Sequence, residues 1–362
     1  MAIWKIDELG EFVTLKRGYD LPQQKRKNGE IPIFSSSGVT GTHNEAMVEA
    51  PGVITGRYGT IGEVFFAETS FWPLNTTLYV ENFHENDEKF VYYFLKTLEW
   101  KKFASASAVP GINRNTVHKE IVRFPDFETQ QKIASVLSTI DKKIAVNKAI
   151  NDNLEQQAAA LFSSLYNRSN TEVRYTDLIQ ILGGGTPKTG ETAYWNGNIA
   201  FFTPKDVGTP YTFITEKTIT EEGLSHCNSR LYPVNTVFVT ARGTVGKVGL
   251  SGIPMAMNQS CYALVGKETH QLLVYFYTLK AVDRLKHKAS GAVFDAITTR
   301  DFDSEQIMKL SDDDAKAFLC VAEPMFQEML NNSIENLRFS TLRDFLLPKL
   351  MSGEIDVSSV QL

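Results

Sequence analysis

The chain has 362 residues, of which 43% are hydrophobic, and a formal net charge of -5 at pH 7. This length favours two globular cores, and no apolar run reaches the roughly 18 residues that a membrane helix needs. The acidic balance excludes a protein that holds DNA through bulk positive charge alone, so any affinity for nucleic acid must come from local patches or from partners.

The N-terminal sequence MAIWKIDELGEF is charged and amphipathic. A secretory signal peptide has an apolar central region instead, so we expect a cytoplasmic protein with no membrane contact. Cys227, Cys261 and Cys320 lie far apart and form no C-x-x-C pair. We therefore predict buried free thiols, with neither a disulfide nor a metal site.

Residues 1–125 contain short runs of β-branched and aromatic residues between glycines and other turn formers. Residues 30–38, 52–59, 63–68 and 77–82 are predicted as strands, and the aromatic stretch 90–103 as a helix. The first globular domain is therefore predicted to be α+β.

The loops of this domain combine cations, amides and hydroxyl groups. Lysine, arginine and backbone amides can position phosphates, whereas arginine, asparagine and serine can read base edges. The candidate DNA contacts are Lys16, Arg17, Lys25, Arg26, Lys27, Ser36, Ser37, Arg57, Tyr58, Thr60, Asn75, Thr76, Asn113 and Arg114.

Residues 126–168 form a long segment without glycine, in which apolar positions alternate in steps of four and three. That spacing predicts a coiled-coil helix, and roughly 37 residues at about 1.5 Å each give a rod on the order of 55 Å long. Its pairing positions include Ile133, Leu137, Ile140, Ile144, Asn147, Asn151 and Leu154. Our hypothesis is that the two asparagines pair with polar groups of residues 331–337 and fix the register.

Residues 169–310 are predicted as a second α+β domain. Its expected strands lie within 198–207, 236–243 and 261–266, and its main helix over 272–287. The candidate DNA contacts here are Thr186, Lys188, Thr189, Lys205, Arg242, Thr244, Lys247, Asn258 and Gln259.

The two domains share sequence features in the same order, which indicates a duplication. TGRYGTIGEV at 55–64 returns as TARGTVGKVG at 240–249. We match Arg57 with Arg242 across one missing residue, which leaves Tyr58 without a counterpart, and Asn75 with Asn258. The glycine spacing fits neither a dinucleotide fingerprint nor a Walker loop, so no nucleotide site is predicted.

Residues 311–350 form the second long segment, followed by a tail at 351–362. Three aspartates suit a helix N-terminus, Pro324 is expected to kink or restart the helix, and Pro348 to end it. The apolar stripe is expected at Phe326, Leu330, Ile334, Leu337, Thr341 and Phe345. Two such helices can lie antiparallel, which predicts a pseudo-two-fold arrangement with the domains at opposite ends.

In combination these motifs resemble the specificity subunit of bacterial type I restriction-modification systems. The resemblance covers nearly the whole chain and is carried by FPDFETQQKIASVL, LRDFLLPKLMSGEI, GGGTPKTGETAYWNGNIAFFTPKDV, LKRGYDLP, GRYGTIG, PLNTT and AVPGINRNTV. One departure is KLSDDDAKAF before the second helix, where the family has a P-x-x-x-Q segment. The docking surface around that helix is therefore expected to differ.

The resemblance implies two target-recognition domains that read a bipartite site in double-stranded DNA, separated by two antiparallel coiled-coil helices. The expected partners are two modification (methyltransferase) subunits, which flip and methylate an adenine, and restriction (translocase and nuclease) subunits. S-adenosylmethionine, ATP and magnesium are expected on those partners, and no cofactor on this chain.

Two other functions stay open at this point. One is a DNA-modifying enzyme with a cryptic active site, although the sequence holds neither a [DN]-P-P-[YF] motif nor a glycine-rich cofactor loop. The other is a scaffold that binds proteins through its coiled coil. The hypothesis of a specificity subunit differs from both, because it predicts that this chain binds DNA in a sequence-dependent way and catalyses no reaction itself.

Overall fold

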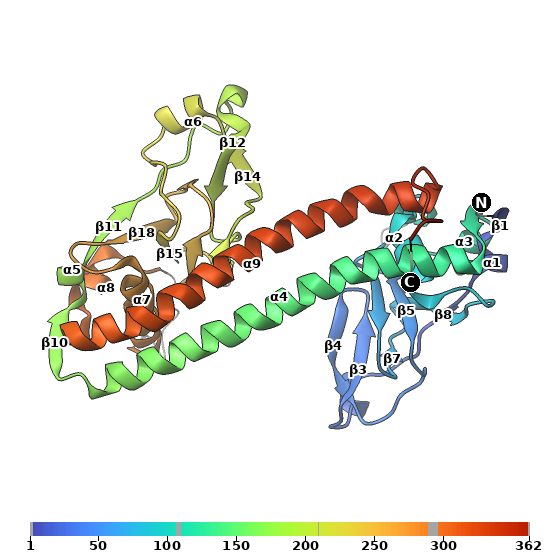
Figure 1. The fold of residues 1–362 in the computed structure, drawn as a ribbon, viewed down its shortest axis with the longest axis horizontal. Coiled ribbons are helices and arrows are strands. Elements are labelled where there is room, and N and C mark those ends of the chain that lie inside the picture. Colours follow the sequence, from blue (N-terminus) through green and yellow to red (C-terminus); the bar gives the residue numbers. More distant parts are fainter. Residues whose placement is uncertain (1–2, 106–109, 209, 289–295, 361–362) are drawn as a thin grey trace. The chain divides into compact units, whose positions relative to one another are not determined.

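The structure, a computed structural model, describes residues 3–105, 110–208, 210–288 and 296–360. The chain divides into two compact units (Figure 1): unit 1 is Met1–Val146 with Asn336–Leu362, and unit 2 is Asn147–Glu335. Residues 108–109 of the AVPGINRNTV motif lie outside the described residues. None of the helices within the described ranges is long and apolar enough to cross a membrane.

Unit 1 contains two small sheets and a two-stranded ribbon. Its strands are β1 (Trp4–Glu8), β2 (Thr14–Arg17), β3 (Ile31–Ser35), β4 (Gly38–His43), β5 (Gly52–Gly56), β6 (Val64–Ala67), β7 (Trp72–Pro73), β8 (Thr77–Asn82) and β9 (Ile121–Pro125). One sheet has the order β2-β8-β5-β6 and the other β4-β3-β7, while β1 pairs with β9. Its short helices are α1 (Leu9–Phe12), α2 (Glu88–Thr97) and α3 (Arg114–His118), with 3-10 turns at Gln23–Lys25 and Trp100–Phe103.

Unit 2 contains the corresponding elements in the same chain order. Its strands are β10 (Thr171–Arg174), β11 (Ile179–Gly183), β12 (Trp195–Phe202), β13 (Tyr211–Thr212), β14 (Lys217–Ile219), β15 (Val237–Thr240), β16 (Val248–Ser251), β17 (Met255–Met257), β18 (Cys261–Gly266) and β19 (Gln306–Lys309). Its short helices are α5 (Tyr175–Leu178), α6 (Glu221–Ser225), α7 (Gln271–Lys288) and α8 (Thr299–Ser304), with a 3-10 turn at Thr192–Tyr194.

The sheets of the two units match strand for strand. The order β11-β18-β15-β16 of unit 2 repeats β2-β8-β5-β6 of unit 1, with β13 added at one edge, and β14-β12-β17 repeats β4-β3-β7. The pairs β3–β7 and β12–β17 are both parallel. The predicted α+β fold and its duplication are confirmed.

Each core lies between the larger sheet and an amphipathic helix. In unit 1, α2 begins at Asp87, whose carboxylate accepts the N–H of Phe90 at 2.7 Å and satisfies one of the helix's free donors. Phe90 and Phe94 then pack with Val53 of β5 in the core. The predicted helix over 90–103 was too long, because the α-helix ends at Thr97 and a 3-10 turn follows.

In unit 2, α7 contributes to an aromatic cluster that joins both long helices to the domain. The ring of Phe276 lies 5.0 Å from that of Phe162 and 5.6 Å from that of Phe326. Phe162 comes from one long helix and Phe326 from the other. Large aromatic side chains bury much apolar area each, so this cluster stabilises the junction strongly.

The two long helices are α4 (Phe127–Arg168, 42 residues) and α9 (Asp312–Ser352, 41 residues). Of the two alternatives expected at Pro324, the restart is wrong, and so is the end expected at Pro348, because the helix continues through both prolines; the kink at Pro324 stays a prediction. Each proline removes the hydrogen bond to the carbonyl four residues earlier, at Cys320 and Asp344. Both of those residues are exposed, so the freed carbonyls can bond to solvent.

The apolar stripe of α9 follows the prediction only in its first half. Phe326 and Leu330 are buried and Ile334 is half-buried, whereas Leu337 is 36% and Phe345 is 59% exposed. Positions seven residues apart rotate by about 20° per repeat on a straight α-helix. A stripe predicted from this spacing over many turns therefore leaves the buried face of the helix. Thr341 is also exposed.

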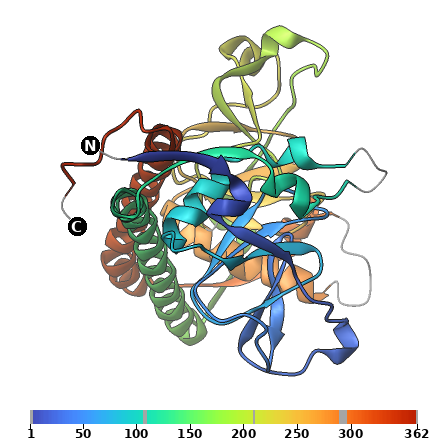
Figure 2. The ribbon, with the colours of Figure 1, turned by 90° about the vertical axis from the view of Figure 1, so that its right-hand side faces the viewer.

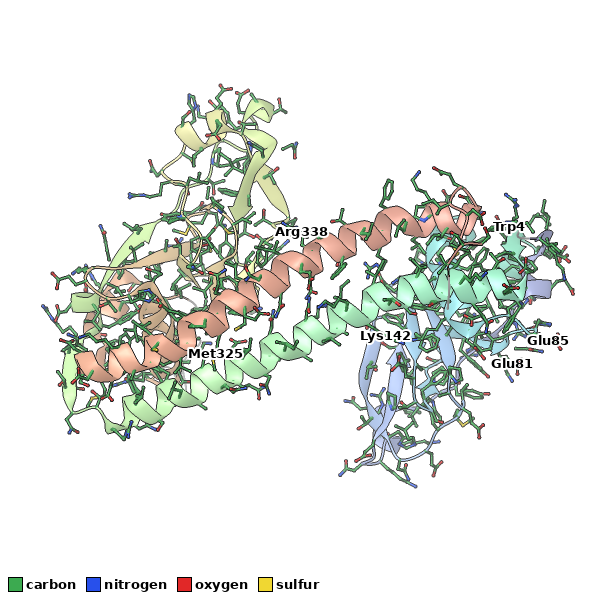
Figure 3. The ribbon with its side chains drawn as sticks, in the orientation of Figure 1. Trp4, Glu81, Glu85, Lys142, Met325 and Arg338 are labelled. Atoms are coloured by element: carbon green, nitrogen blue, oxygen red, sulfur yellow. The ribbon has the colours of Figure 1, made fainter. Side chains whose placement is uncertain are left out.

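After α9 the chain returns to the start of unit 1. Gly353 has φ of +78°, and a Cβ there would lie 2.7 Å from the indole of Trp4. Val357 is buried, and the Lys132 ammonium donates to the carbonyl of Ser358 at 3.3 Å. Figure 2 shows β1 beginning beside this segment, and Figure 3 shows Trp4 at the end of α9.

The three cysteines are free, as predicted, but only Cys261 is buried. Burial raises the pKa of its thiol to about 12, so it is an inert core residue. Cys227 is half-buried and Cys320 is exposed on the solvent side of α9, so the prediction of burial is wrong for these two.

Candidate nucleic-acid interface

The loop between β5 and β6 lies at the centre of a cluster of loops in unit 1. The N–H groups of Arg57 and Tyr58 both donate to the carbonyl of Thr76, at 2.9 and 3.2 Å. The N–H of Ile112 donates to the carbonyl of Arg57 at 3.0 Å. Three loops that are distant in sequence therefore meet at residues 57–58.

The loop between β15 and β16 makes the same bonds in unit 2. The N–H groups of Ala241 and Arg242 donate to the carbonyl of Ser260 at 2.8 and 3.2 Å, and the N–H of Ile297 donates to that of Ala241 at 2.9 Å. A shared set of backbone bonds defines equivalent positions more reliably than similar letters do, since backbone pairing is obligatory in a folded chain.

The glycines of the two loops fix their lengths. Gly59 and Gly243 have φ of +75° and +80°, and Gly62 and Gly246 have φ of +90° and +73°. Such angles favour glycine, so these positions set the register of each loop. The two loops therefore align without a gap.

The predicted match of Arg57 with Arg242 is consequently wrong. The backbone bonds make Arg57 equivalent to Ala241 and Tyr58 equivalent to Arg242. The predicted match paired the two arginines, whereas the length of each loop is set by its positive-φ glycines.

The same bonds correct a second match. Thr76 and Ser260 are equivalent, so Asn75 corresponds to Gln259, not to Asn258. The side chain of Asn258 serves its own turn, in which Oδ1 accepts the N–H of Ser260 at 3.0 Å.

The two arginines lie in different surroundings. Arg57 is half-buried, its Nε–H donates to the carbonyl of Ile112 at 3.2 Å, and its guanidinium carbon lies 4.6 Å from the centre of the Tyr58 ring. Arg242 is exposed. Arg57 thus holds the loops of unit 1 together, whereas the Arg242 side chain can reach a ligand.

Each cluster also contains a side-chain bond between an amide and the loop that follows the first strand of the larger sheet. Asn75 Nδ2 donates to the carboxylate of Asp20 in unit 1, and the hydroxyl of Thr186 bonds to Oε1 of Gln259 in unit 2. Asp20 was not among the predicted residues, because an aspartate in a turn is usually only a turn former.

Several predicted cations lie in exposed ion pairs. Lys16 pairs with Glu81 (labelled in Figure 3) at 2.5 Å, and this hydrogen bond raises the pKa of Lys16. Lys205 pairs with Glu216 at 3.4 Å. Exposed pairs contribute only about 0–1 kcal/mol each, so a phosphate can replace the acidic partner.

A hollow of about 460 Å³ opens beside the unit 2 cluster. Its lining brings together three predicted residues, Lys205, Thr244 and Asn258, from three separate loops. The hydroxyl of Thr244 donates to the carbonyl of Pro204 at 3.0 Å, which links two of these loops.

The remaining predicted residues differ in exposure. Lys25, Lys27, Ser37, Thr60, Asn113, Arg114, Lys188, Thr189 and Lys247 are exposed, and Arg26 and Ser36 are half-buried. The segment 25–27 contacts β4, where the N–H of Lys27 donates to Nδ1 of His43 at 3.0 Å. The side chain of Asn113 is the N-cap of α3, since it accepts the N–H of Asn115 at 3.0 Å.

The two asparagines of α4 contact the stretch of α9 with which pairing was predicted. Asn147 is buried, and its Nδ2 donates to Oε2 of Glu335 at 2.6 Å. Asn151 donates to the hydroxyl of Ser333 at 3.2 Å and accepts from Asn332 at 3.0 Å. Residue numbers rise on α4 as they fall on α9, so the helices are antiparallel here.

The apolar pairing positions are mostly buried. Ile133, Leu137, Ile140, Ile144 and Leu330 are buried, and Leu154 and Ile334 are half-buried. The sequence pattern missed a polar contact in unit 1, where Arg343 of α9 pairs with Asp141 of α4 at 2.8 Å. Asp141 also accepts from the hydroxyl of Tyr93 at 2.6 Å, and burial raises the pKa of this tyrosine.

No cluster of three or more metal-binding side chains occurs in the part of the chain that the structure describes. Each unit instead presents loops with amides, hydroxyls and cations over a repeated backbone. A duplicated fold with two such loop clusters defines a protein that recognises two sites of one kind.

Comparison with known proteins identifies that kind of site. Residues 1–156 and 167–309 match the family described as the type I restriction modification DNA specificity domain. The chain belongs to this family. Its members are the DNA-recognition subunits of type I restriction-modification systems and are not catalytic themselves.

Curated relatives agree with this assignment. The chain is 25% identical over 345 residues to the specificity subunit of the type I restriction enzyme HindI from Haemophilus influenzae, with 72% of this chain and 75% of that one covered. It is 32% identical over 124 residues to the MjaIX specificity subunit from Methanocaldococcus jannaschii, covering 33% of this chain and 29% of that one.

A solved structure shares the fold. The S subunit of a type I restriction-modification system from M. genitalium superposes with a TM-score of 0.65 at 16% identity, and the match covers 96% of each chain. This likeness shows the fold, and the family match gives the function, which is recognition of a DNA target by two domains, with catalysis on partner subunits.

Proposed function

We propose that each unit reads one half of a bipartite DNA target through its loop cluster, and that α4 and α9 set the gap between the halves. The observation that carries this proposal is the pair of equivalent clusters on a duplicated fold. Each contains an amide at one position, Asn75 or Gln259, and glycines that let the backbone approach a ligand closely.

The partners that this function requires are two modification subunits and the restriction subunits. The modification subunits would flip an adenine in each half-site and methylate it from S-adenosylmethionine, and ATP and magnesium would act on the partners as well. Since host DNA is the substrate, we place the complex in the cytoplasm. The partners would also supply the positive charge that this chain, with a net charge of -5, lacks.

The spacing role rests on the continuity of the two helices. At about 1.5 Å per residue, helices of 42 and 41 residues are roughly 60 Å long. A separation of about 34–36 Å, one turn of the duplex, brings two readers to the same face of the DNA. A stiff pair of helices fixes such a distance, and a flexible linker does not.

Paired insertions test this role. One heptad is inserted after Val146 in α4 and another before Asn336 in α9, so that each helix gains about 10.5 Å and keeps its buried face. The complex with its partners is expressed, and methylated adenines are mapped across the host genome. The gap is expected to grow by about three base pairs, given about 3.4 Å per pair.

The matched control carries the heptad in α4 alone. It shifts the Asp141–Arg343 pair by about 10.5 Å relative to the Asn147–Glu335 pair, so the two pairs cannot both form, and it is expected to abolish modification at any defined gap. A paired insertion that modifies the original target with its original gap would disprove the spacing role. A wild-type complex without any bipartite motif would disprove the proposed function itself.

A further inference from the structure

The bond between Asp20 and Asn75 has a consequence for which base unit 1 reads. Asn75 lies directly before Thr76, whose carbonyl holds the central loop of the cluster, and it is half-buried at the surface. Its Nδ2 donates to Oδ1 of Asp20, which also lies 3.5 Å from Nη2 of Arg17. The amide is therefore held from one side by a carboxylate.

A carboxylate only accepts hydrogen bonds, whereas an amide has an accepting end and a donating end. Asp20 can therefore bond only to the NH2 end of Asn75. This chemistry, and not the drawn position of the atoms, fixes the orientation of the amide. The groups left for a ligand are the Oδ1 acceptor and the second N–H donor, side by side.

We propose that Asn75 reads an adenine in the half-site of unit 1 and that Asp20 is its positioning residue. This inference rests on the proposed function, because it requires that the unit 1 cluster contacts a half-site. In the major groove adenine presents the N6 amino donor next to the N7 acceptor, which matches an amide that offers an acceptor next to a donor. Guanine presents two acceptors there, O6 and N7, and so leaves Oδ1 without a donor.

Unit 2 lacks this constraint at the equivalent position. Gln259 is bonded to the hydroxyl of Thr186, and a hydroxyl can donate or accept. Either end of the Gln259 amide can therefore face Thr186, and the other end is presented outwards. The two units thus hold an amide at the same place, but only unit 1 holds it in one orientation.

The test uses the complex with its modification partners and a duplex that contains its bipartite target. Each adenine of the unit 1 half-site is replaced in turn by 7-deazaadenine, which lacks N7, or by purine, which lacks the N6 amino group. At one adenine, both analogues are expected to weaken wild-type binding by about 5- to 150-fold, which corresponds to about 1–3 kcal/mol. Asn75→Ala is expected to weaken binding to natural DNA and to remove this sensitivity.

The positioning role of Asp20 is tested separately by Asp20→Thr, which copies unit 2. It is expected to reduce the preference for adenine over guanine at that base by about tenfold, because the amide can then turn over. Glu68→Gln, which changes another exposed carboxylate of the same unit, is the matched control and should leave the preference unchanged. The unchanged analogue sensitivity of the unit 2 half-site shows that each variant is folded and assembled.

Two results would overturn the inference: Asn75→Ala that keeps the full analogue sensitivity at every adenine, or Asp20→Thr that keeps the full adenine preference. Either result would leave the proposed function standing, since the wild-type complex would still select its bipartite target. A wild-type complex that binds this target no better than an unrelated duplex would overturn both.

Discussion

Tyr58 in unit 1 and Arg242 in unit 2 occupy one backbone position, and each forms a bridge to the loop before a short helix. Tyr58 pairs with Gly111, whereas Arg242 pairs with Ala296. A Cβ at Gly111 would lie 2.1 Å from Cε1 of Tyr58, so the ring requires glycine there. Arg242 has no aromatic ring to contact its partner, so alanine, Ala296, fits at the position that corresponds to Gly111.

This difference shows which parts of the two loop clusters are the same and which parts differ between the two units. The backbone bonds and the positive-φ glycines are the same in both units, so the frame of the cluster is conserved between them. The side chains at positions 58 and 242, and at 75 and 259, differ in their chemistry. Under the proposed function we expect two half-sites of different sequence, because side chains are what read base edges.

The largest effect is expected for Gly111→Ala. The added methyl group displaces the Tyr58 ring and should destabilise unit 1 by about 1–3 kcal/mol. Urea unfolding, monitored by hydrogen exchange of the amides of unit 1, measures this change in stability. Adding Tyr58→Arg, the pair found in unit 2, should restore most of the loss.

Gly183→Ala, measured by hydrogen exchange in unit 2, is the control, since no atom lies within 4 Å of the added Cβ, and its cost should stay within about 0.5 kcal/mol. If Tyr58→Arg fails to rescue Gly111→Ala, the interpretation of residues 58 and 111 as a matched pair is wrong.

The second prediction separates the roles of two arginines. Arg242→Ala should remove about 1–3 kcal/mol of discrimination at one base pair of the unit 2 half-site, most simply a G·C pair, and leave stability nearly unchanged. Arg57→Ala should instead lower the stability of unit 1 by about 1 kcal/mol, because the bond to the Ile112 carbonyl and the contact with the Tyr58 ring are lost.

Binding to a set of duplexes with single base changes, measured beside urea unfolding, distinguishes the two outcomes. Loss of stability in Arg242→Ala, or altered base preference without loss of stability in Arg57→Ala, would contradict this division of roles.

The fold was readable from the sequence because its signals are local. Short runs of β-branched and aromatic residues between turn formers predicted the strands that became β3, β5, β6 and β8, and the steps of four and three predicted α4. The prolines of α9 misled the prediction, since a long helix with exposed carbonyls tolerates the loss of single bonds. The extent of this tolerance depends on packing that local sequence does not contain.

The cluster was only partly predictable. Sequence located its loops through glycine, asparagine and arginine, but it could not show that Arg57 contacts the carbonyl of Ile112, a residue 55 positions away. Asp20 was missed because an aspartate in a turn is usually only a turn former, and the sequence does not show that it contacts Asn75 in another loop. Contacts between distant loops depend on the register of the sheet, which single letters do not specify.

The smallest effect concerns His118 of unit 1, whose equivalent position in unit 2 holds no histidine. Nε2 of His118 accepts the N–H of Leu15 at 2.9 Å, and burial, followed by the nearby Arg114 and His84, lowers its pKa. The N–H of Leu9 donates to the carbonyl of Glu120, and the N–H of Tyr175 donates to that of Glu305, so Glu120 and Glu305 are equivalent. The residue two positions before Glu305, the exposed Asp303, is therefore the counterpart of His118 in unit 2. A pH effect from this position is therefore expected in unit 1 alone.

The sign follows from proton uptake. The unfolded chain protonates His118 near its ordinary pKa of about 6.5, whereas the folded unit holds it neutral to lower pH. Stability is therefore complete above about pH 6.5 and falls as the pH drops through and below that value. Hydrogen exchange at pH 7.5 and 5.5, corrected for the intrinsic rate, should show unit 1 weakening, and His118→Gln should weaken less, since glutamine does not titrate. An equal loss in wild type and His118→Gln would mean that other groups cause the pH dependence, and that the half-buried histidine is only a neutral acceptor at every pH tested.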